Sequence, residues 1–329
     1  MAAHETDAVM NSSGVTRRNL LGGLAVAAGA DARAESPERP KALRIGYQKL
    51  GVLLVAKARR ILESRFEPQG ISVKWLEFAF GPPLLEALAA GAVDYGYTGD
   101  SPPIFAQAAR ADFVYAAAIP EKAYAQGVVV RTNAPIFDVA GLAGKKIGVA
   151  KASSGHSLLI AALEAAGLAW SDISPVYLAP ADAAAAFTSG AIDAWAIWDP
   201  FLAIAEARAG ARQIQLDPVA STQSSFFLAN RTYAGKHPWV IQAVNEDLQS
   251  ASEWATKHRD DVAALYTEAT GVPLDAQRTS VARAHFAVAP LDESLIARQQ
   301  AVADRYLRLG LISASIDVRE YVLGARTKS

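Results

Sequence analysis

The stretch KKIGVAKASSGHSLLIAALEAAG, residues 145–167, decides what kind of fold this chain adopts. Residues 146–150 predict a short buried strand, a small polar turn follows, and an apolar helix then runs to a stop at Gly167. A helix that starts on the small residues 153–155 has backbone N–H groups without intrahelical partners, and an anion can approach them closely. The turn therefore predicts an anion-binding helix start, with an ordinary serine cap as the alternative.

The composition describes a globular protein of nearly balanced charge. The 329 residues are enough for two domains, 51% of them are hydrophobic, and the formal net charge is −1. This balance argues against nucleic acid or an anionic membrane as the main partner. There is no cysteine, and the five histidines have no close pair at metal-ligand spacing on one helix. We therefore expect no metal site and no cofactor.

The first 34 residues have the pattern of an export signal. Arg17 and Arg18 precede a short, weakly apolar run at residues 22–30, and a small-x-small pattern ends at Ala34. This pattern resembles a twin-arginine signal peptide, with a disordered tail as the alternative. Residues 35–42 are expected to form a linker. The prediction is an exported, periplasmic protein.

Residues 43–124 alternate between predicted strands and helices, which indicates a parallel sheet covered by helices on both faces. Ligands of such sheets bind beyond the carboxyl ends of the strands. The residues expected along this rim are Gln48, Lys49, Gly81, Thr98, Gly99, Asp100 and Ser101.

The αβ pattern begins again after residue 124 and contains an internal repeat. The stretch GAVDYGYTGD at 91–100 aligns without gaps on GAIDAWAIWD at 190–199. We therefore expect two lobes of similar build that face each other across a cleft, with Asp100 and Asp199 at its edge; helix capping is the alternative role for both. The second lobe is expected to span 125–227, and the mostly helical residues 228–329 are expected to return to the first lobe and close over it.

Two lobes joined by two crossovers form a hinged clamp, but the sequence lacks the motifs of an enzyme. It has no nucleophile elbow, no phosphate-binding loop motif and no zinc-protease motif. His156 follows Ser154 too closely along one helix start to activate it as a nucleophile. We therefore expect His156 to donate to an anion or to lie at the rim of the cleft, and we expect no catalytic residue.

Five short strings, taken together and in order, resemble the periplasmic aliphatic-sulfonate-binding proteins of ATP-binding-cassette importers. They are YQK at 47–49, FGP at 80–82, TGDSPPIFAQA at 98–108, KASSGH at 151–156 and DAWAIWDP at 193–200. The resemblance implies an α/β type II periplasmic-binding fold, with two doubly wound lobes joined by a two-crossover hinge. It also implies a monomer that delivers an alkanesulfonate to a membrane permease. Relatives that bind taurine, nitrate or sulfate esters share much of this pattern, so these ligands stay open, as does an enzyme on the same scaffold.

A sulfonate is ionised and weakly basic, so neutral hydroxyl and amide donors and a helix start suit it. The ligand-binding residues that follow from the resemblance are Gln48, Gly81, Pro82, Thr98, Gly99, Asp100, Ser101, Ser153, Ser154, Gly155, His156, Trp198 and Asp199. Tyr47, Phe80, Tyr124 and Trp198 are expected to form apolar walls for the organic tail. The family usually carries a larger residue at position 155, so Gly155 is expected to leave more room near the head group.

Overall fold

The computed structural model describes residues 39–120 and 125–324. The predicted signal peptide, residues 35–38 of the predicted linker and Tyr124 lie outside the described residues. Within the described ranges, no helix combines the length and the apolar character needed to cross a bilayer.

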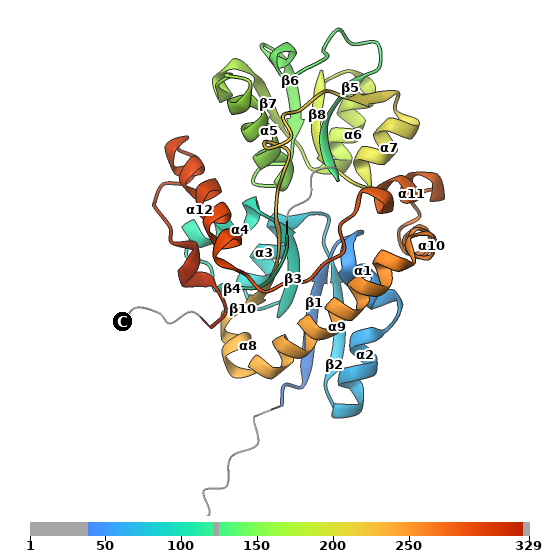
Figure 1. Ribbon diagram of the computed structural model, residues 1–329, viewed down its shortest axis with the longest axis vertical. Helices are drawn as coiled ribbons and strands as arrows, with labels where there is room; N and C mark the ends of the chain where they lie inside the picture. The colour runs from blue at the N-terminus through green and yellow to red at the C-terminus, as the bar shows by residue number, and fades with distance from the viewer. Residues whose placement is uncertain (1–38, 121–124, 325–329) are drawn as a thin grey trace, which may run out of the picture. The chain divides into compact units, whose positions relative to one another are not determined.

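The first lobe is built on a five-stranded sheet with the order β2-β1-β3-β10-β4 (Figure 1). Its strands are β1 (Ala42–Tyr47), β2 (Ser72–Glu77), β3 (Tyr95–Gly99), β4 (Phe113–Ile119) and β10 (Ser225–Asn230). The four strands of residues 43–124 run in the same direction, as expected, and the later strand β10 pairs antiparallel with both β3 and β4. This strand enters from the second lobe, so it starts at the edge where β1 and β3 end and runs in the opposite direction.

The second lobe repeats this arrangement in a second five-stranded sheet, with the order β7-β6-β8-β5-β9. Its strands are β5 (Gln126–Arg131), β6 (Lys146–Val149), β7 (Ser174–Tyr177), β8 (Ala194–Trp198) and β9 (Ala211–Gln213). Here β5 is the antiparallel strand next to β8. The chain crosses between the sheets after β4 and again before β10. The expected lobe boundary at residue 227 therefore falls inside β10, which belongs to the first sheet from Ser225 onward.

Helices cover both faces of each sheet. The first lobe carries α1 (Gly51–Ala58), α2 (Ile61–Phe66), α3 (Gly81–Ala89) and α4 (Ser101–Ala108), and the second carries α5 (Ser154–Ala165), α6 (Pro180–Ser189) and α7 (Phe201–Arg208). Alternation along β10 shows why two layers form. Phe227 packs into the core under α1 and α9, whereas Phe226 and Leu228 pack into the core under α3 and α12.

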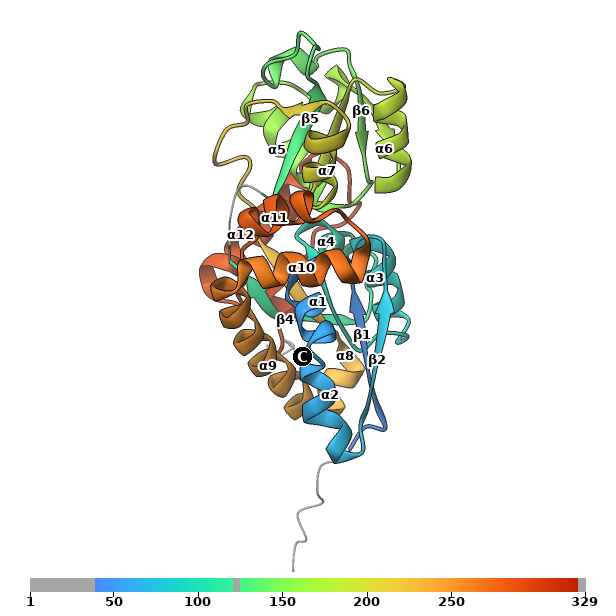
Figure 2. The same ribbon diagram turned by 90° about the vertical axis from the view of Figure 1, so that its right-hand side faces the viewer.

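The C-terminal tail consists of α8 (Arg231–Lys236), α9 (Pro238–Lys257), α10 (Arg259–Thr270), α11 (Leu274–Arg283) and α12 (Glu293–Arg308). We expected it to close over the first lobe, and α9 and α10 do pack on α1. Two tail helices also contact the second lobe: α11 packs against α7 (Figure 2), and Arg305 of α12 pairs with Glu164 of α5 at 2.7 Å. The tail therefore bridges both lobes.

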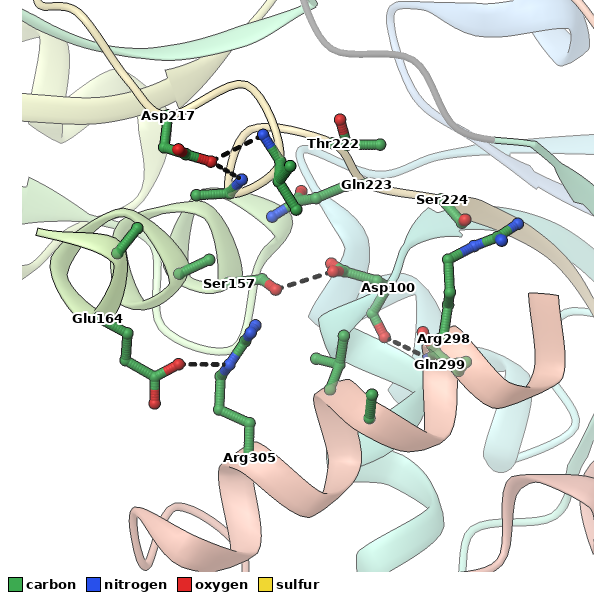
Figure 3. Close-up of a pocket in the computed structure, with 16 residues that line it drawn as sticks. Asp100, Ser157, Glu164, Asp217, Thr222, Gln223, Ser224, Arg298, Gln299 and Arg305 are labelled. Atoms are coloured by element: carbon green, nitrogen blue, oxygen red, sulfur yellow. Dashed lines mark hydrogen bonds and ion pairs between the residues drawn. The ribbon is translucent and has the colours of Figure 1, made fainter. Parts of the chain in front are cut away.

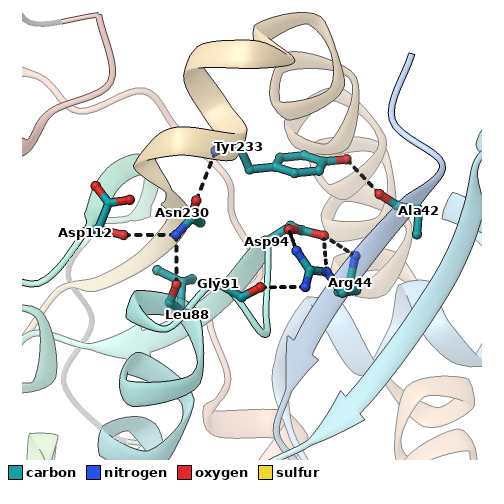
Figure 4. Close-up of polar contacts among 8 residues, drawn as sticks. All are labelled: Ala42, Arg44, Leu88, Gly91, Asp94, Asp112, Asn230 and Tyr233. Atoms are coloured by element: carbon teal, nitrogen blue, oxygen red, sulfur yellow. Dashed lines mark hydrogen bonds and ion pairs between the residues drawn. The ribbon is translucent and has the colours of Figure 1, made fainter. Parts of the chain in front are cut away.

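The internal repeat places an equivalent hydrogen bond, from a backbone N–H to an aspartate, in each sheet. The carboxylate of Asp94 accepts a hydrogen bond from the backbone N–H of Arg44 at 2.8 Å, and Asp193 accepts one from Lys146 N–H at the same distance. Each aspartate thereby ties the start of a central strand to its neighbour. In the first lobe the Arg44 side chain adds a second bond to Asp94 at 2.9 Å (Figure 4).

Candidate functional site

A cavity of about 110 Å³ lies where the two lobes meet, at the carboxyl ends of the central strands. Both lobes and the second crossover contribute to its wall, and none of the described residues that line it has a charged side chain. The lining residues are Gln48, Leu50, Gly81, Tyr97, Gly99, Pro102, Ala125, Gln126, Ser153, Ser154, Trp198, Gln223 and Ser225. Six of the thirteen predicted site residues are among them: Gln48, Gly81, Gly99, Ser153, Ser154 and Trp198.

On the second lobe, the N-terminus of α5 reaches the cavity at Ser154. Ser153 caps this helix: its hydroxyl donates to the carbonyl of Ala150 at 2.6 Å and accepts from the N–H of His156 at 3.3 Å. The Ser153 hydroxyl hydrogen is therefore used inside the turn, as the capping alternative predicted. Ser154, at the first helical position, is the hydroxyl residue of this turn that can present a donor to the cavity.

Gly155 has a packing role that sequence reasoning did not find. A Cβ on this residue would lie 2.9 Å from the backbone oxygen of Ala196 in β8. The missing side chain lets α5 lie directly against the central strand, so the space is filled by β8. Gly155 does not line the cavity, and the expectation of extra room near the head group is wrong.

On the first lobe, Gln48 and the start of α3 face the cavity. The Gln48 side-chain amide donates to the carbonyl of Tyr97 at 3.0 Å and has a second hydrogen for another acceptor. Helix α3 begins at Gly81 without a side-chain cap. A Cβ there would lie 2.7 Å from the ring of Pro102, so Gly81 allows α3 and α4 to meet. Pro82 follows in the helix, has no N–H and is not part of the lining.

The two lobes touch directly beside the cavity. A Cβ on Gly99 would lie 2.7 Å from the Cβ of Ser154, and one residue further on, Asp100 accepts a hydrogen bond from Ser157 at 2.8 Å (Figure 3). Asp100 also caps α4 by accepting from the N–H of Ser101 at 2.7 Å. Burial raises the pKa of this carboxyl to about 7, against the opposing effect of these hydrogen bonds. Asp100 thus joins the lobes and caps a helix, and it lies outside the cavity lining.

Two other rim residues use their hydroxyls inside the protein. Thr98 donates to the carbonyl of Gly99 at 3.0 Å, and the Ser101 hydroxyl is hydrogen-bonded to that of Tyr306 in α12. Neither residue lines the cavity. Both were expected among the ligand-binding residues, and the structure gives them contacts within the first lobe.

His156 is completely buried and points away from the cavity. Its Nδ1 accepts a hydrogen bond from the backbone N–H of Ala152 at 3.3 Å, and its ring packs among four aromatic residues from both lobes: Phe105, Trp170, Tyr177 and Tyr306. Burial lowers its pKa to about 4, so the ring is neutral at pH 7. A neutral, enclosed imidazole is not placed to donate to a ligand in the cavity, nor to act as a base there.

Asp199 also lies behind the cavity. One of its oxygens accepts from the N–H of Ala203 at 3.0 Å and lies 3.5 Å from the guanidinium of Arg283 in α11. Burial raises its pKa to about 6, while Arg283 opposes that shift. Asp199 therefore caps α7 and ties the second lobe to the tail. Three of the four expected apolar wall residues are described by the structure: the neighbouring Trp198 lines the cavity, whereas Tyr47 and Phe80 do not.

Sequence reasoning missed two glutamines, Gln126 at the start of β5 and Gln223 in the second crossover. Gln126 donates to the side-chain oxygen of Gln223, and Gln223 donates to the carbonyl of Ser154 at 3.3 Å. Tyr97 and Ser225 were also missed. No motif marks such residues, because crossover segments are recognised by their position between sheets and not by their sequence. Among the described residues, no group of histidine and acidic side chains could hold a metal ion.

Comparison with known proteins places this chain. Residues 65–262 match the family described as NMT1/THI5 like. The chain belongs to the NMT1/THI5-like family. Within this family, a protein of Escherichia coli (strain K12), named as a candidate aliphatic sulfonates-binding protein, is 41% identical over 305 residues, which are 92% of this chain and 94% of that protein.

Two solved structures each cover 87% of this chain. The alkanesulfonate-binding protein SsuA from Xanthomonas axonopodis pv. citri, bound to MOPS, is 38% identical with a TM-score of 0.83, and 99% of that chain is covered. The periplasmic aliphatic sulphonate binding protein SsuA from Escherichia coli is 39% identical with a TM-score of 0.78, and 98% of it is covered. These similarities confirm the two-lobed periplasmic-binding fold. The desulfurization enzyme DSZB has the same fold at 19% identity and a TM-score of 0.62.

Proposed function

We propose that this chain is a substrate-binding protein that captures an aliphatic sulfonate between its lobes and delivers it to an ATP-binding-cassette importer. The observation that carries the proposal is the cavity at the start of α5, which both lobes line with uncharged donors and apolar groups. The relatives named for sulfonate binding cover nearly the whole mature chain, which supports the same ligand class here.

The cavity chemistry suits an anion that is weakly basic. The Ser154 hydroxyl, the unpaired N–H groups in the first turn of α5 and the second amide hydrogen of Gln48 are neutral donors that can surround three sulfonate oxygens. Leu50, Tyr97 and Trp198 offer apolar surface to the carbon attached to sulfur. A phosphate would be doubly charged for part of its population at pH 7, and the lining residues that the structure describes include no cationic side chain to balance that charge.

We further propose that the protein acts as a monomer in the periplasm, after export by the twin-arginine-like signal of residues 1–34. The basic pair and small-residue site in that segment support export, and the Escherichia coli structure is named as a periplasmic protein. The expected partner is the membrane permease of the importer. Taurine, nitrate and sulfate esters remain the competing ligands.

The test is a thermal-shift and calorimetry screen of residues 35–329 with alkanesulfonates, taurine, alkyl sulfates, sulfate, phosphate and nitrate. A ligand at a hundredfold excess over its Kd stabilises the folded state by about 2.7 kcal/mol. We expect stabilisation by alkanesulfonates and none by phosphate. If only nitrate or only taurine stabilised the protein, that compound would be the ligand and the proposed sulfonate would be wrong. Consumption of any of these compounds by the pure protein would support an enzyme on this fold.

A further inference from the structure

Helices α7 and α11 join the two lobes behind the cavity wall formed by Trp198. Figure 1 shows this contact to the right of the second crossover, with α4 and α12 to its left. Arg283, the last residue of α11, pairs here with two carboxylates of the second lobe. Its guanidinium lies 3.5 Å from Asp199 and 2.5 Å from Glu206. The Arg283 side chain is 21% exposed, so water and salt screen this contact only in part.

The end of α11 that carries Arg283 is fixed to the first lobe. Helix α11 packs against α10, which in turn packs on α1. Arg259 of α10 donates to the carbonyl of Val281 and, at 3.2 Å, to that of Ala284, which lie on either side of Arg283 in the chain. Val281 is also part of the first lobe's core. The pairing of Arg283 with the second lobe is therefore a contact between the lobes.

Asp199 connects this contact to the cavity wall, because it follows Trp198 directly. Its carboxyl is buried, and one oxygen accepts from the N–H of Ala203 at 3.0 Å, whereas the other has no hydrogen-bond partner among the described residues. Within the described ranges, Arg283 is the one cation paired with this carboxylate. A buried carboxylate depends strongly on its cationic partner. The chain next to Trp198 therefore depends on α11 for its position.

A second ion pair joins the same two helices and provides an internal comparison. Arg208 of α7 lies 2.9 Å from Asp275 of α11, and both side chains are more than half exposed. Exposed pairs of this kind contribute little, because water solvates both groups when they separate. Of the two pairs between α7 and α11, the one at Arg283 is the buried one.

We propose that Arg283 is a positioning residue for ligand capture, which acts through Asp199 to hold the cavity wall at Trp198 against the first lobe and so keeps the lobes closed. Arg283 does not line the cavity, so it has no direct contact with a ligand there. Its effect on affinity rests on the proposed function, whereas its effect on closure does not depend on which anion binds.

The first test compares Arg283→Gln with Arg208→Gln, the matched control on the same pair of helices. Calorimetry and stopped-flow measurements with 1-butanesulfonate at pH 7.5 give the Kd and the dissociation rate. We expect Arg283→Gln to raise the Kd about tenfold or more, mainly through faster dissociation. Arg208→Gln should change it less than about twofold. If Arg283→Gln does not fold, Arg283→Lys replaces it with the same expected direction, because lysine lacks the planar fork that reaches both carboxylates.

A double variant tests whether Arg283 acts through Asp199. In an Asp199→Asn background the carboxylate charge is gone, so Arg283→Gln should weaken butanesulfonate binding by at most about a further twofold. A residue that only packs between the helices would cost the same affinity in both backgrounds. An undiminished effect of Arg283→Gln in the Asp199→Asn background would overturn the proposal.

Closure itself is measured by the distance between two spin labels. The chain has no cysteine, so Glu86→Cys on α3 and Asp182→Cys on α6, both at exposed positions, give two unique attachment sites. Figure 2 shows these helices on the same side of the two lobes. We expect longer or more broadly distributed distances in Arg283→Gln than in the otherwise unchanged chain.

The two kinds of measurement separate this inference from the proposed function. If butanesulfonate does not bind the wild type, the proposed sulfonate is wrong, and the spin-label distances still decide the role of Arg283. If butanesulfonate binds and Arg283→Gln changes neither its dissociation rate nor the distances, the proposed function stands and Arg283 is not a positioning residue.

Discussion

The Ser157 hydroxyl of the second lobe donates a hydrogen bond of 2.8 Å to the Asp100 carboxylate of the first lobe. The bond lies one helical turn beyond the start of α5, next to the point where Gly99 and Ser154 touch. It joins the lobes beside the candidate site, and it does so through a buried carboxyl whose pKa is raised to about 7. We therefore expect the contact between the lobes to depend on pH in the range around 7.

Asp100→Asn should change how stability depends on pH. Because the pKa of Asp100 is higher in the folded than in the unfolded chain, its contribution is fully present below about pH 4 and is lost as pH rises through 7. At 1.36 kcal/mol per unit, that contribution is about 4 kcal/mol. Urea unfolding between pH 4 and 8 gives the free energies of unfolding of the wild type and the variant. The advantage of the wild type over the variant should shrink or reverse as pH rises. Asp182→Asn, on an exposed turn of α6, controls for the substitution itself; a pH-independent difference for Asp100→Asn would contradict the assignment.

His156→Phe should have the opposite pH signature. Burial lowers the pKa of His156 to about 4, so its contribution is present above the unfolded value of about 6.5 and is lost as pH falls through 4. The shift corresponds to roughly 3 kcal/mol. Phenylalanine keeps the aromatic packing against Phe105 and Tyr306 and removes the titrating group. In thermal melts between pH 4 and 7, the melting temperature of the variant should fall less with decreasing pH than that of the wild type. If both melting temperatures fell equally, His156 would not be the group that makes the protein sensitive to acid.

Gly99→Ala should weaken ligand binding more than it weakens folding. The added methyl group would lie 2.7 Å from Ser154 Cβ, a side-chain contact across the two lobes, and the backbone of Gly99 is not in the left-handed region. The clash is relieved when the lobes move apart slightly. This movement makes closure of the lobes around a ligand less favourable, whereas the core of each lobe is unchanged. We expect a Kd about tenfold higher or more by calorimetry, with a loss of at most about 1 kcal/mol in unfolding free energy. A large stability loss with unchanged affinity would exclude this reading.

Gly155→Ala provides the contrast, because its methyl group would press on the backbone oxygen of Ala196 at 2.9 Å within one lobe. Overpacking of that kind costs typically about 1–3 kcal/mol, so this variant should lose stability first. Comparing urea midpoints with Kd values for the two glycine variants tests whether position 99 acts on closure and position 155 on packing.

Ser154→Ala and Ser153→Ala should separate binding from capping. Ser154 lines the cavity, so losing its donor to a charged ligand should cost about 1.5–3 kcal/mol of binding free energy. Ser153 donates to Ala150 and caps α5, so its loss should cost about 1 kcal/mol of stability. Calorimetry and urea unfolding on both variants measure the two effects. Equal effects on binding would show that both hydroxyls contact the ligand.

Much of the fold followed from local patterns. The strand, turn and helix of residues 145–167 form as expected, and the repeat of 91–100 in 190–199 corresponds to equivalent strands with equivalent aspartate contacts. These features depend on hydrophobic periodicity and turn chemistry, which act within about ten residues of the chain. The antiparallel entry of β10 and the bridging of both lobes by α11 and α12 depend on where distant segments arrive, and were not predicted.

The sequence by itself determined the two-lobed α/β architecture and the absence of cysteine chemistry, and it predicted a binding site at the start of α5. Tertiary structure alone decided which candidate residues face the cavity. Four polar candidates lie near the carboxyl ends of the strands, where a ligand is expected: Asp100, Ser153, His156 and Asp199. A sequence pattern cannot distinguish a polar group that faces a ligand from one that already has a hydrogen-bond partner within the protein. That distinction depends on partners far apart in sequence, such as Ser157 for Asp100 and Arg283 for Asp199, because a buried polar group is hydrogen-bonded by whatever the fold brings next to it.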